Sequence, residues 1–211
     1  MKFTGILQVF LLFALLSLGL GASLPAGFSL RIARDGDYTV GKMGFKGEIG
    51  GHYFELNGTL QDVVAQAQKL HPGLQHNWTA PDLSKGPLPD GKSLEARQGT
   101  PIGRFCWPVA GQPWGAVYHT DLSAAIDALR SVFWNLCTFP PNACAPLSCT
   151  ANTQLSVCND NPWSIAVNCG NTLSEMALEI NQNCNTWNGL TGGQQFNSMN
   201  YNLVVEYRGG C

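Results

Sequence analysis

Eight cysteines are the residues of this chain with the most definite chemistry, and all lie in its second half. They are Cys106, Cys137, Cys144, Cys149, Cys158, Cys169, Cys184 and Cys211. An even number in a secreted chain predicts four disulfides with no thiol left over, although the connectivity stays open. Zinc is the competing interpretation. The chain has no Cys-x-x-Cys pair, however, and the spacing from Cys144 to Cys149 has no matching second pair or nearby histidine.

Few other residues have types and spacing suited to catalysis. His119 is the only histidine after Arg97, and with Asp121 it could form a general base and its orienting carboxylate. A strand end at His119 and a helix cap at Asp121 explain the same residues structurally. The stretch 159–161, Asn-Asp-Asn, lacks the spacing of a calcium loop, so a turn is predicted there. We therefore expect no enzyme activity, no metal and no cofactor.

The N-terminal residues 1–23 indicate the compartment. Lys2 precedes an almost wholly apolar run from Ile6 to Leu20, and small residues follow it. This is the layout of a secretory signal peptide. A membrane anchor is the alternative, because the run is close to the shortest length that spans a bilayer. The small residues and Pro25 favour cleavage, so we expect a secreted, extracellular protein without stable membrane insertion.

The charge of the chain is low and nearly balanced. Lys and Arg number 12 and Asp and Glu number 14, giving a formal net charge of -2. This balance argues against a polybasic nucleic-acid binder, and no nucleic-acid partner is expected. After Arg97 there is no lysine at all, so solubility there must come from Asn, Gln, Ser and Thr.

The cysteine-free residues 24–97 carry a pattern of their own. Phe28–Val40 alternates around an Asp-Gly-Asp turn, and Gly51–Gly58 has the composition of another strand. Thr59 and Asp62 have the spacing of a capping box, and a helical apolar face follows before His71-Pro72 ends it. A small β-β-α unit is therefore predicted. Two N-glycosylation sequons begin at Asn57 and Asn77, and none lies after residue 97.

Residues 78–92 are dense in proline and glycine, which predicts an exposed linker ending at Leu94-Glu-Ala-Arg97. Leu94-x-x-Arg97 resembles the kexin-type processing motif of many fungal secreted effectors. The alternative is an ordinary interdomain linker that happens to contain an arginine. We predict cleavage after Arg97, so that residues 24–97 are a propeptide and residues 98–211 are the product. That division would explain why every cysteine lies on one side of the boundary.

The cysteine-rich residues 98–211 predict a small α+β fold. Asp121 and a Thr172–Glu175 capping box each begin a helix with one apolar face. Four strands are expected, at Trp114–Thr120, Thr153–Cys158, Trp163–Cys169 and Tyr201–Tyr207, the middle two forming a hairpin. The order is βαββαβ, a sandwich with one antiparallel sheet and both helices on one face. Four disulfides would offset the small size of its core.

Five tryptophans fall after Arg97, and two of them lie in predicted loops rich in Pro, Gly and Asn. These two, Trp107 and Trp187, are candidate binding residues, because an exposed indole stacks on a sugar or packs against a partner protein. The other three are assigned to the core or left open.

Three stretches, Leu155–Cys184, Gly192–Phe196 and Tyr201–Tyr207, resemble fungal small secreted cysteine-rich effectors. The related domain also occurs in killer-toxin-like chitinases, and smut killer toxins are comparable α/β sandwiches. The resemblance implies a monomeric effector or toxin-like virulence protein that binds a host or competitor protein or glycan. It implies no catalytic residue. A secreted lectin-like protein is the alternative, and a secreted hydrolase would need polar groups converging in a pocket that the sequence barely supplies.

Overall fold

The computed structural model describes residues 38–78 and 99–211, which form a mixed α/β fold with four disulfides. The predicted signal peptide, most of the 28–40 hairpin and the processing motif at Leu94 and Arg97 lie outside the described residues. Within the described residues, no helix is both long and apolar enough to cross a membrane.

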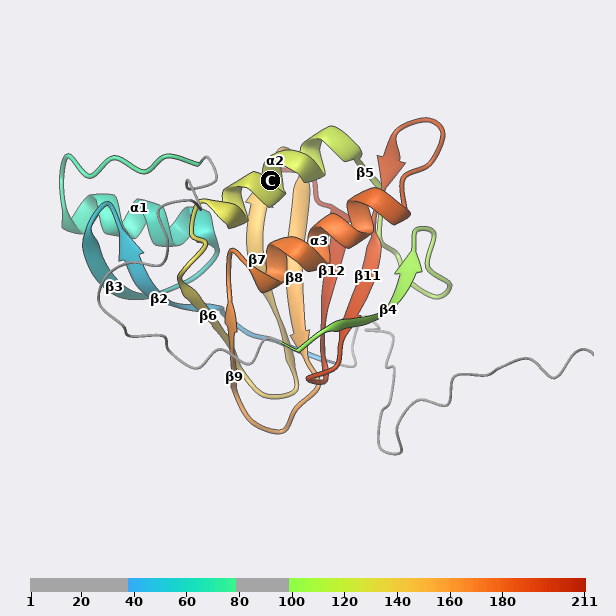
Figure 1. Ribbon diagram of the computed structural model, residues 1–211, viewed down its shortest axis with the longest axis horizontal. Helices are drawn as coiled ribbons and strands as arrows, with labels where there is room; N and C mark the ends of the chain where they lie inside the picture. Colours follow the sequence, from blue (N-terminus) through green and yellow to red (C-terminus); the bar gives the residue numbers. More distant parts are fainter. Residues whose placement is uncertain (1–37, 79–98) are drawn as a thin grey trace, which may run out of the picture.

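A six-stranded sheet forms the centre of the molecule. Its order is β1-β7-β8-β12-β11-β4, and every pairing is antiparallel except β1 with β7. The strands are β1 Thr39–Val40, β4 Pro101–Cys106, β7 Ala143–Thr150, β8 Thr153–Asn159, β11 Gly193–Asn197 and β12 Tyr201–Tyr207. Helices α2 (His119–Arg130) and α3 (Thr172–Asn183) lie side by side over one face of it (Figure 1).

A second sheet has four strands and joins the two halves of the chain. Its order is β3-β2-β6-β9, with β2 Gly44–Ile49, β3 His52–Asn57, β6 Leu136–Phe139 and β9 Ile165–Asn168. Helix α1 (Leu60–Leu70) packs beside β2 and β3, on the left of the molecule in Figure 1. A short pair, β5 (Val117–Tyr118) with β10 (Leu190–Thr191), completes the strands.

The β-β-α unit predicted in the cysteine-free half is present over its described part, as β2, β3 and α1. Thr59 caps α1, because its hydroxyl accepts a hydrogen bond from the Asp62 N–H while the Asp62 carboxylate accepts one from the Thr59 N–H at 3.0 Å. This reciprocal pair is the predicted capping box. The helix ends at Leu70, with His71 as its C-cap directly before Pro72, as expected.

The other two helix caps were predicted wrongly. Helix α2 begins at His119, two residues before Asp121, and its N-cap Tyr118 makes no side-chain hydrogen bond. Helix α3 has Asn171 at its N-cap, so Thr172 is already helical and no capping box forms. Other hydrogen bonds hold the two helix starts: the His119 N–H donates to the Gly189 carbonyl at 2.9 Å, and the Asn171 N–H donates to the Asn168 side-chain oxygen at 2.6 Å.

The expected hairpin of residues 153–158 with 163–169 does not form, and the sheet is not single. β8 pairs with β7 and β12, whereas β9 pairs with β6 in the other sheet. Asn159 explains the divergence: its amide group donates to the carbonyls of Pro140 at 2.9 Å and Trp163 at 2.8 Å. Its side-chain oxygen accepts from the Asn161 N–H at 3.0 Å. These bonds redirect the chain from one sheet to the next.

All eight cysteines are paired, which confirms the disulfide framework. Cys144–Cys158 joins directly opposite positions of β7 and β8, and Cys137–Cys169 joins β6 to the residue after β9. Cys106–Cys184 ties the end of β4 to the end of α3, and Cys149–Cys211 ties β7 to the C-terminus.

His76 makes the packing of residues 38–78, called the N-terminal segment below, against the rest of the protein sensitive to acid. Its Nε2 lies 3.1 Å from the Ser131 hydroxyl, which itself donates to the Ala128 carbonyl, and its ring meets Trp78 edge-on. Burial lowers the pKa of His76 below its ordinary value of 6.5. The unfolded chain therefore takes up this proton more readily, so the contribution of His76 to stability is fully present above about pH 6.5 and is lost as the pH is lowered.

We expect His76→Gln to reduce the loss of stability between about pH 7.5 and about pH 5. Urea unfolding of the full chain at both pH values measures this, with His119→Gln, at an exposed position of α2, as the matched control. An acid-induced loss that His76→Gln leaves unchanged would contradict the assignment.

Candidate functional site

The loop between α3 and β10 presents the most exposed large hydrophobic side chain among the described residues. Trp187 is 98% exposed. The loop is nevertheless well ordered by its own bonds: the Thr186 N–H donates to the Leu190 carbonyl at 2.8 Å, and the Gly189 N–H donates to the Thr186 carbonyl at 2.9 Å. The Thr186 hydroxyl also accepts from the Leu190 N–H at 3.1 Å. A closed turn therefore holds the indole in solvent.

Two further exposed aromatic residues are connected to this loop through the backbone. Tyr118 of β5 pairs with Leu190, and Tyr207 at the end of β12 pairs with Gly115 just before β5. Their side chains are 60% and 53% exposed. We call Tyr118, Trp187 and Tyr207 the aromatic end of the molecule. Neither tyrosine was predicted as a site residue, because a strand tyrosine is equally typical of a packed surface.

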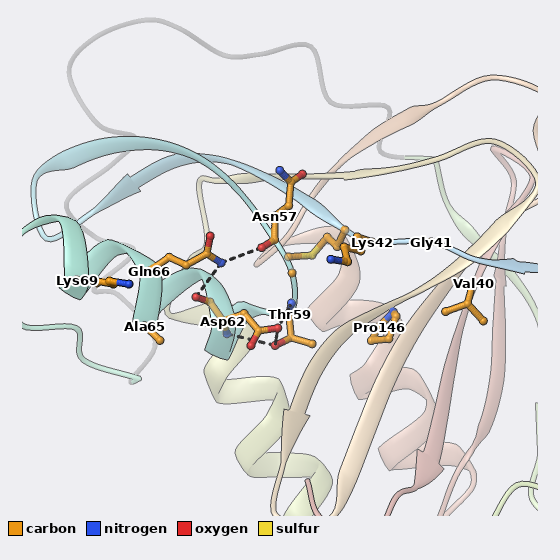
Figure 2. Close-up of a pocket in the computed structure, with 12 residues that line it drawn as sticks. Val40, Gly41, Lys42, Asn57, Thr59, Asp62, Ala65, Gln66, Lys69 and Pro146 are labelled. Carbon is orange, nitrogen blue, oxygen red and sulfur yellow. Dashed lines mark hydrogen bonds between the residues drawn. The ribbon is translucent and has the colours of Figure 1, made fainter.

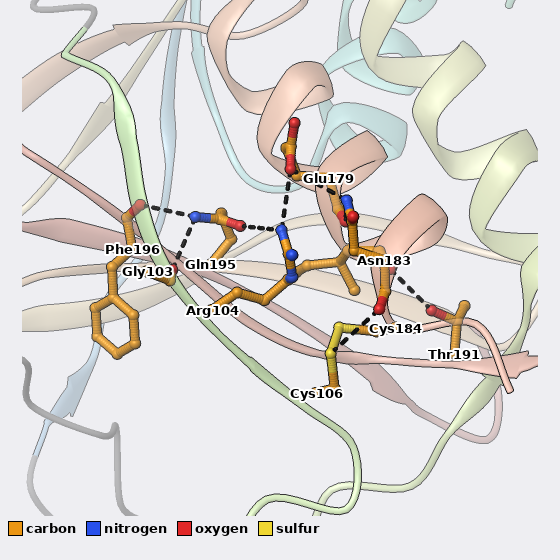
Figure 3. A network of polar contacts seen from close by, with 10 residues as sticks. Gly103, Arg104, Cys106, Glu179, Asn183, Cys184, Thr191, Gln195 and Phe196 are labelled. Carbon is orange, nitrogen blue, oxygen red and sulfur yellow. Dashed lines mark hydrogen bonds and ion pairs between the residues drawn. A yellow bond between two sulfur atoms is a disulfide. The ribbon is translucent and has the colours of Figure 1, made fainter. Parts of the chain in front are cut away.

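The disulfide Cys106–Cys184 and a polar network fix where the loop begins. Arg104 of β4 forms an ion pair with Glu179 of α3 at 2.9 Å, and Gln195 of β11 donates to the Gly103 carbonyl at 2.8 Å. Figure 3 shows these contacts beside the disulfide, joining the last turn of α3 to β4 and β11. The start of the 185–189 loop is thus attached covalently and by hydrogen bonds to the sheet.

The two tryptophans that the sequence singled out differ in their surroundings. The Trp187 side chain is almost fully exposed to solvent. Trp107 is only partly exposed, and its indole N–H donates to the Trp114 carbonyl at 3.0 Å. The Trp107 N–H also donates to the Gly192 carbonyl at 2.9 Å. Trp107 therefore stabilises the loop that follows β4, and Trp187 is the tryptophan whose side chain is accessible to a binding partner.

The residues considered for catalysis are not brought together as a catalytic pair. His119 is exposed at the start of α2, and its backbone carbonyl accepts from the Ser123 hydroxyl at 2.9 Å. In residues 38–78 and 99–211 no hydrogen bond or ion pair joins the His119 and Asp121 side chains. Over the same residues, no three His, Cys, Asp or Glu side chains are grouped so as to hold a metal ion.

A pocket of about 870 Å³ lies elsewhere, between the start of α1, residues 40–43 and Pro146 (Figure 2). Two of its polar side chains are engaged, since Asp62 caps α1 and Gln66 donates to the Asn57 carbonyl at 2.8 Å. Asn57, the acceptor of the first sequon, is exposed and lines this pocket. A glycan attached there would start at the pocket itself. This location disfavours the pocket as a ligand site.

Comparison with protein-family models, with curated proteins and with solved structures finds no match to this chain. The candidate site is therefore defined by its geometry alone.

Proposed function

We propose that the protein is a secreted fungal effector or toxin-like protein that acts by binding a host or competitor target. In this proposal it is made as a preproprotein, cut after Arg97, and related in architecture to the α/β sandwiches of smut killer toxins. The observation that carries the proposal is a fully exposed indole, Trp187, on a loop anchored by a disulfide. The four disulfides are consistent with an extracellular protein.

The chemistry of the aromatic end suits recognition of another molecule. Trp and Tyr are enriched at binding hot spots, because each buries a large area while fixing few rotatable bonds. Asn185 lies two residues before Trp187 and Asn188 directly after it, and their side-chain amides can donate hydrogen bonds to a partner that covers the indole. An indole held in solvent contributes little to folding, so its placement is better explained by a partner.

Trp187→Ala should therefore separate binding from stability. We expect the free energy of unfolding to change by less than about 0.5 kcal/mol, because the side chain has almost no contacts to lose. Biological activity should fall by about tenfold or more, as for a central hot-spot residue. The measurement is a dose–response for host cell death and for growth inhibition of competing fungi, using the purified secreted protein.

Trp163→Ala is the matched control. Trp163 is another exposed tryptophan, at 50%, but it lies in the connection between β8 and β9, away from the loop that follows α3 (Figure 1). Equal activity losses in both variants would indicate a general effect on the protein. Full activity in Trp187→Ala would remove the aromatic end as the target-binding surface.

A secreted carbohydrate-binding protein is the second candidate, favoured by the same exposed indole with Asn185 and Asn188 close to it in the loop. A sugar ring stacks on an indole while amides bond its hydroxyls. Chitin pull-down and glycan arrays distinguish the two proposals: glycan binding that disappears in Trp187→Ala supports the lectin, and activity without glycan binding supports the effector. Trp107→Ala is a poorer probe, because it removes the hydrogen bond to Trp114.

A further inference from the structure

Residues 38–78 contribute strands, core and hydrogen bonds to the same folded unit as the disulfide-rich residues. We infer that they are a permanent subunit of the protein. A cut in residues 79–98 then yields two chains that stay associated without a covalent bond, and no propeptide is released. The inference takes the proposed processing one step further, from where the chain is cut to what the mature protein contains.

The sheets are continuous across the two segments. Gly44–Lys46 of β2 pairs in register with Leu136–Thr138 of β6. On the other sheet, β1 pairs in parallel with β7, and the Gly41 N–H donates to the Cys144 carbonyl at 2.9 Å. Loss of residues 38–78 would leave β6 and β7 with exposed edges, which natural proteins avoid because such edges pair with other chains.

The apolar core is also shared. Met43, Phe45 and Leu60 from the N-terminal segment are almost completely buried in one cluster with Phe139 and Leu147 from the disulfide-rich segment. A buried side chain of this kind has no other place in the fold to pack. Release of the segment would expose apolar surface on both partners at once.

Gln61 of α1 attaches the segment to β7 through three polar contacts. Its side-chain oxygen accepts from the Cys149 N–H at 3.0 Å. Its side-chain amide donates to the hydroxyls of Ser148 at 3.1 Å and Thr150 at 2.8 Å. Cys149 lies in β7 and forms a disulfide with Cys211, so Gln61 binds to a strand of the disulfide-rich part of the protein.

Asn135 forms a second set of contacts with the N-terminal segment, at the backbone of Glu48 in β2. Its amide donates to the Glu48 carbonyl at 2.9 Å, and its oxygen accepts from the Glu48 N–H at 3.0 Å. Gly47 permits this approach, because a Cβ there would lie 2.2 Å from the Asn135 oxygen and its φ is +150°. The N-terminal segment thus has a glycine at the position that the Asn135 side chain approaches most closely.

No cysteine occurs before Cys106, so no disulfide would hold the two chains together after a cut. The acceptor asparagines of both sequons, Asn57 and Asn77, lie in residues 38–78 and are exposed. A released propeptide would remove them, whereas a retained one makes the mature protein a two-chain glycoprotein.

The test is a controlled cut in the full chain. A specific protease site replaces part of residues 85–92 and the folded, purified protein is cleaved to completion. We expect native mass spectrometry and size exclusion to show one particle containing both fragments, and a denaturing, non-reducing gel to show two separate chains. Elution of the disulfide-rich fragment alone would overturn the inference.

Gln61→Ala then tests the interface itself. In the cut protein we expect it to raise the dissociation constant of the two fragments about tenfold or more, because the Cys149 N–H is left without its acceptor. Gln68→Ala, at an exposed position on the same helix, is the matched control and should change nothing. Equal effects from the two variants would contradict the assigned contact. N-terminal sequencing of the secreted protein tests the natural cut separately.

Discussion

The disulfide-rich fragment 98–211, expressed alone, should fail to reach the native structure. Residues 38–78 supply Met43, Phe45, Ile49 and Leu60, all nearly fully buried in the common core. Burying such side chains contributes about 1.5–3 kcal/mol each, so together they are comparable to the whole stability of a typical domain, about 5–15 kcal/mol. Oxidative refolding of the fragment should give a mixture of disulfide isomers without a near-UV circular dichroism spectrum.

The matched experiment adds a peptide of residues 38–78 during refolding. Native disulfides should then accumulate, and a Phe45→Ala peptide should restore them less well, because Phe45 is buried between the two segments. A fragment that forms four native disulfides alone, with the same unfolding midpoint as the full chain, would contradict this expectation. It would also mean that assays with the isolated fragment report on the native protein.

The sequence predicted best those elements whose signals are local. Helix α1 was predicted through its capping box and apolar face, and strands β8 and β12 through alternation. The even cysteine count correctly predicted complete pairing. Each of these depends on residues within about one turn or strand of each other, which is the range at which pattern and propensity are informative.

The missed elements depend on distant partners. β6 and β7 are not among the four strands expected after residue 97, and Pro140, Pro141 and Pro146 interrupt the apolar pattern there. β7 tolerates Pro146 because the register shifts there, next to Ser148. β6 is a strand because β2, some ninety residues earlier, pairs with it. No sequence pattern near β6 indicates that β2 is its partner. The pairing between the cysteine-free and cysteine-rich halves of the chain therefore could not be predicted from local composition.

The candidate site was predicted only in part for a similar reason. Both Trp107 and Trp187 lie in loops rich in Pro, Gly and Asn, and local composition does not distinguish them. Their exposure differs because Trp114 accepts a hydrogen bond from one indole, while the closed turn at Thr186 directs the other outward. Tyr118 and Tyr207 are linked to this loop only through the backbone pairing of β5 and Gly115, a long-range contact that no local sequence pattern indicates.

Removal of the Cys137–Cys169 disulfide should cost more stability than removal of Cys144–Cys158. The sequence separation is 32 for the first and 14 for the second, so the loop-closure contribution is about 4 kcal/mol against about 3 kcal/mol. Both sulfurs of Cys137–Cys169 are also fully buried, and their replacement leaves a cavity in the common core. The same bridge fixes β6, on which β2 depends.

The measurement is urea unfolding of the full chain carrying Cys137→Ala with Cys169→Ala, compared with Cys144→Ala with Cys158→Ala. Double substitution avoids a free thiol that could exchange with the remaining bridges. We expect a loss of about 4–6 kcal/mol for the first pair, enough to leave little native protein at 37 °C. A smaller loss for this pair than for the other would show that β6 is held by the sheet and core without its disulfide. The N-terminal segment would then have to be the main support of that strand.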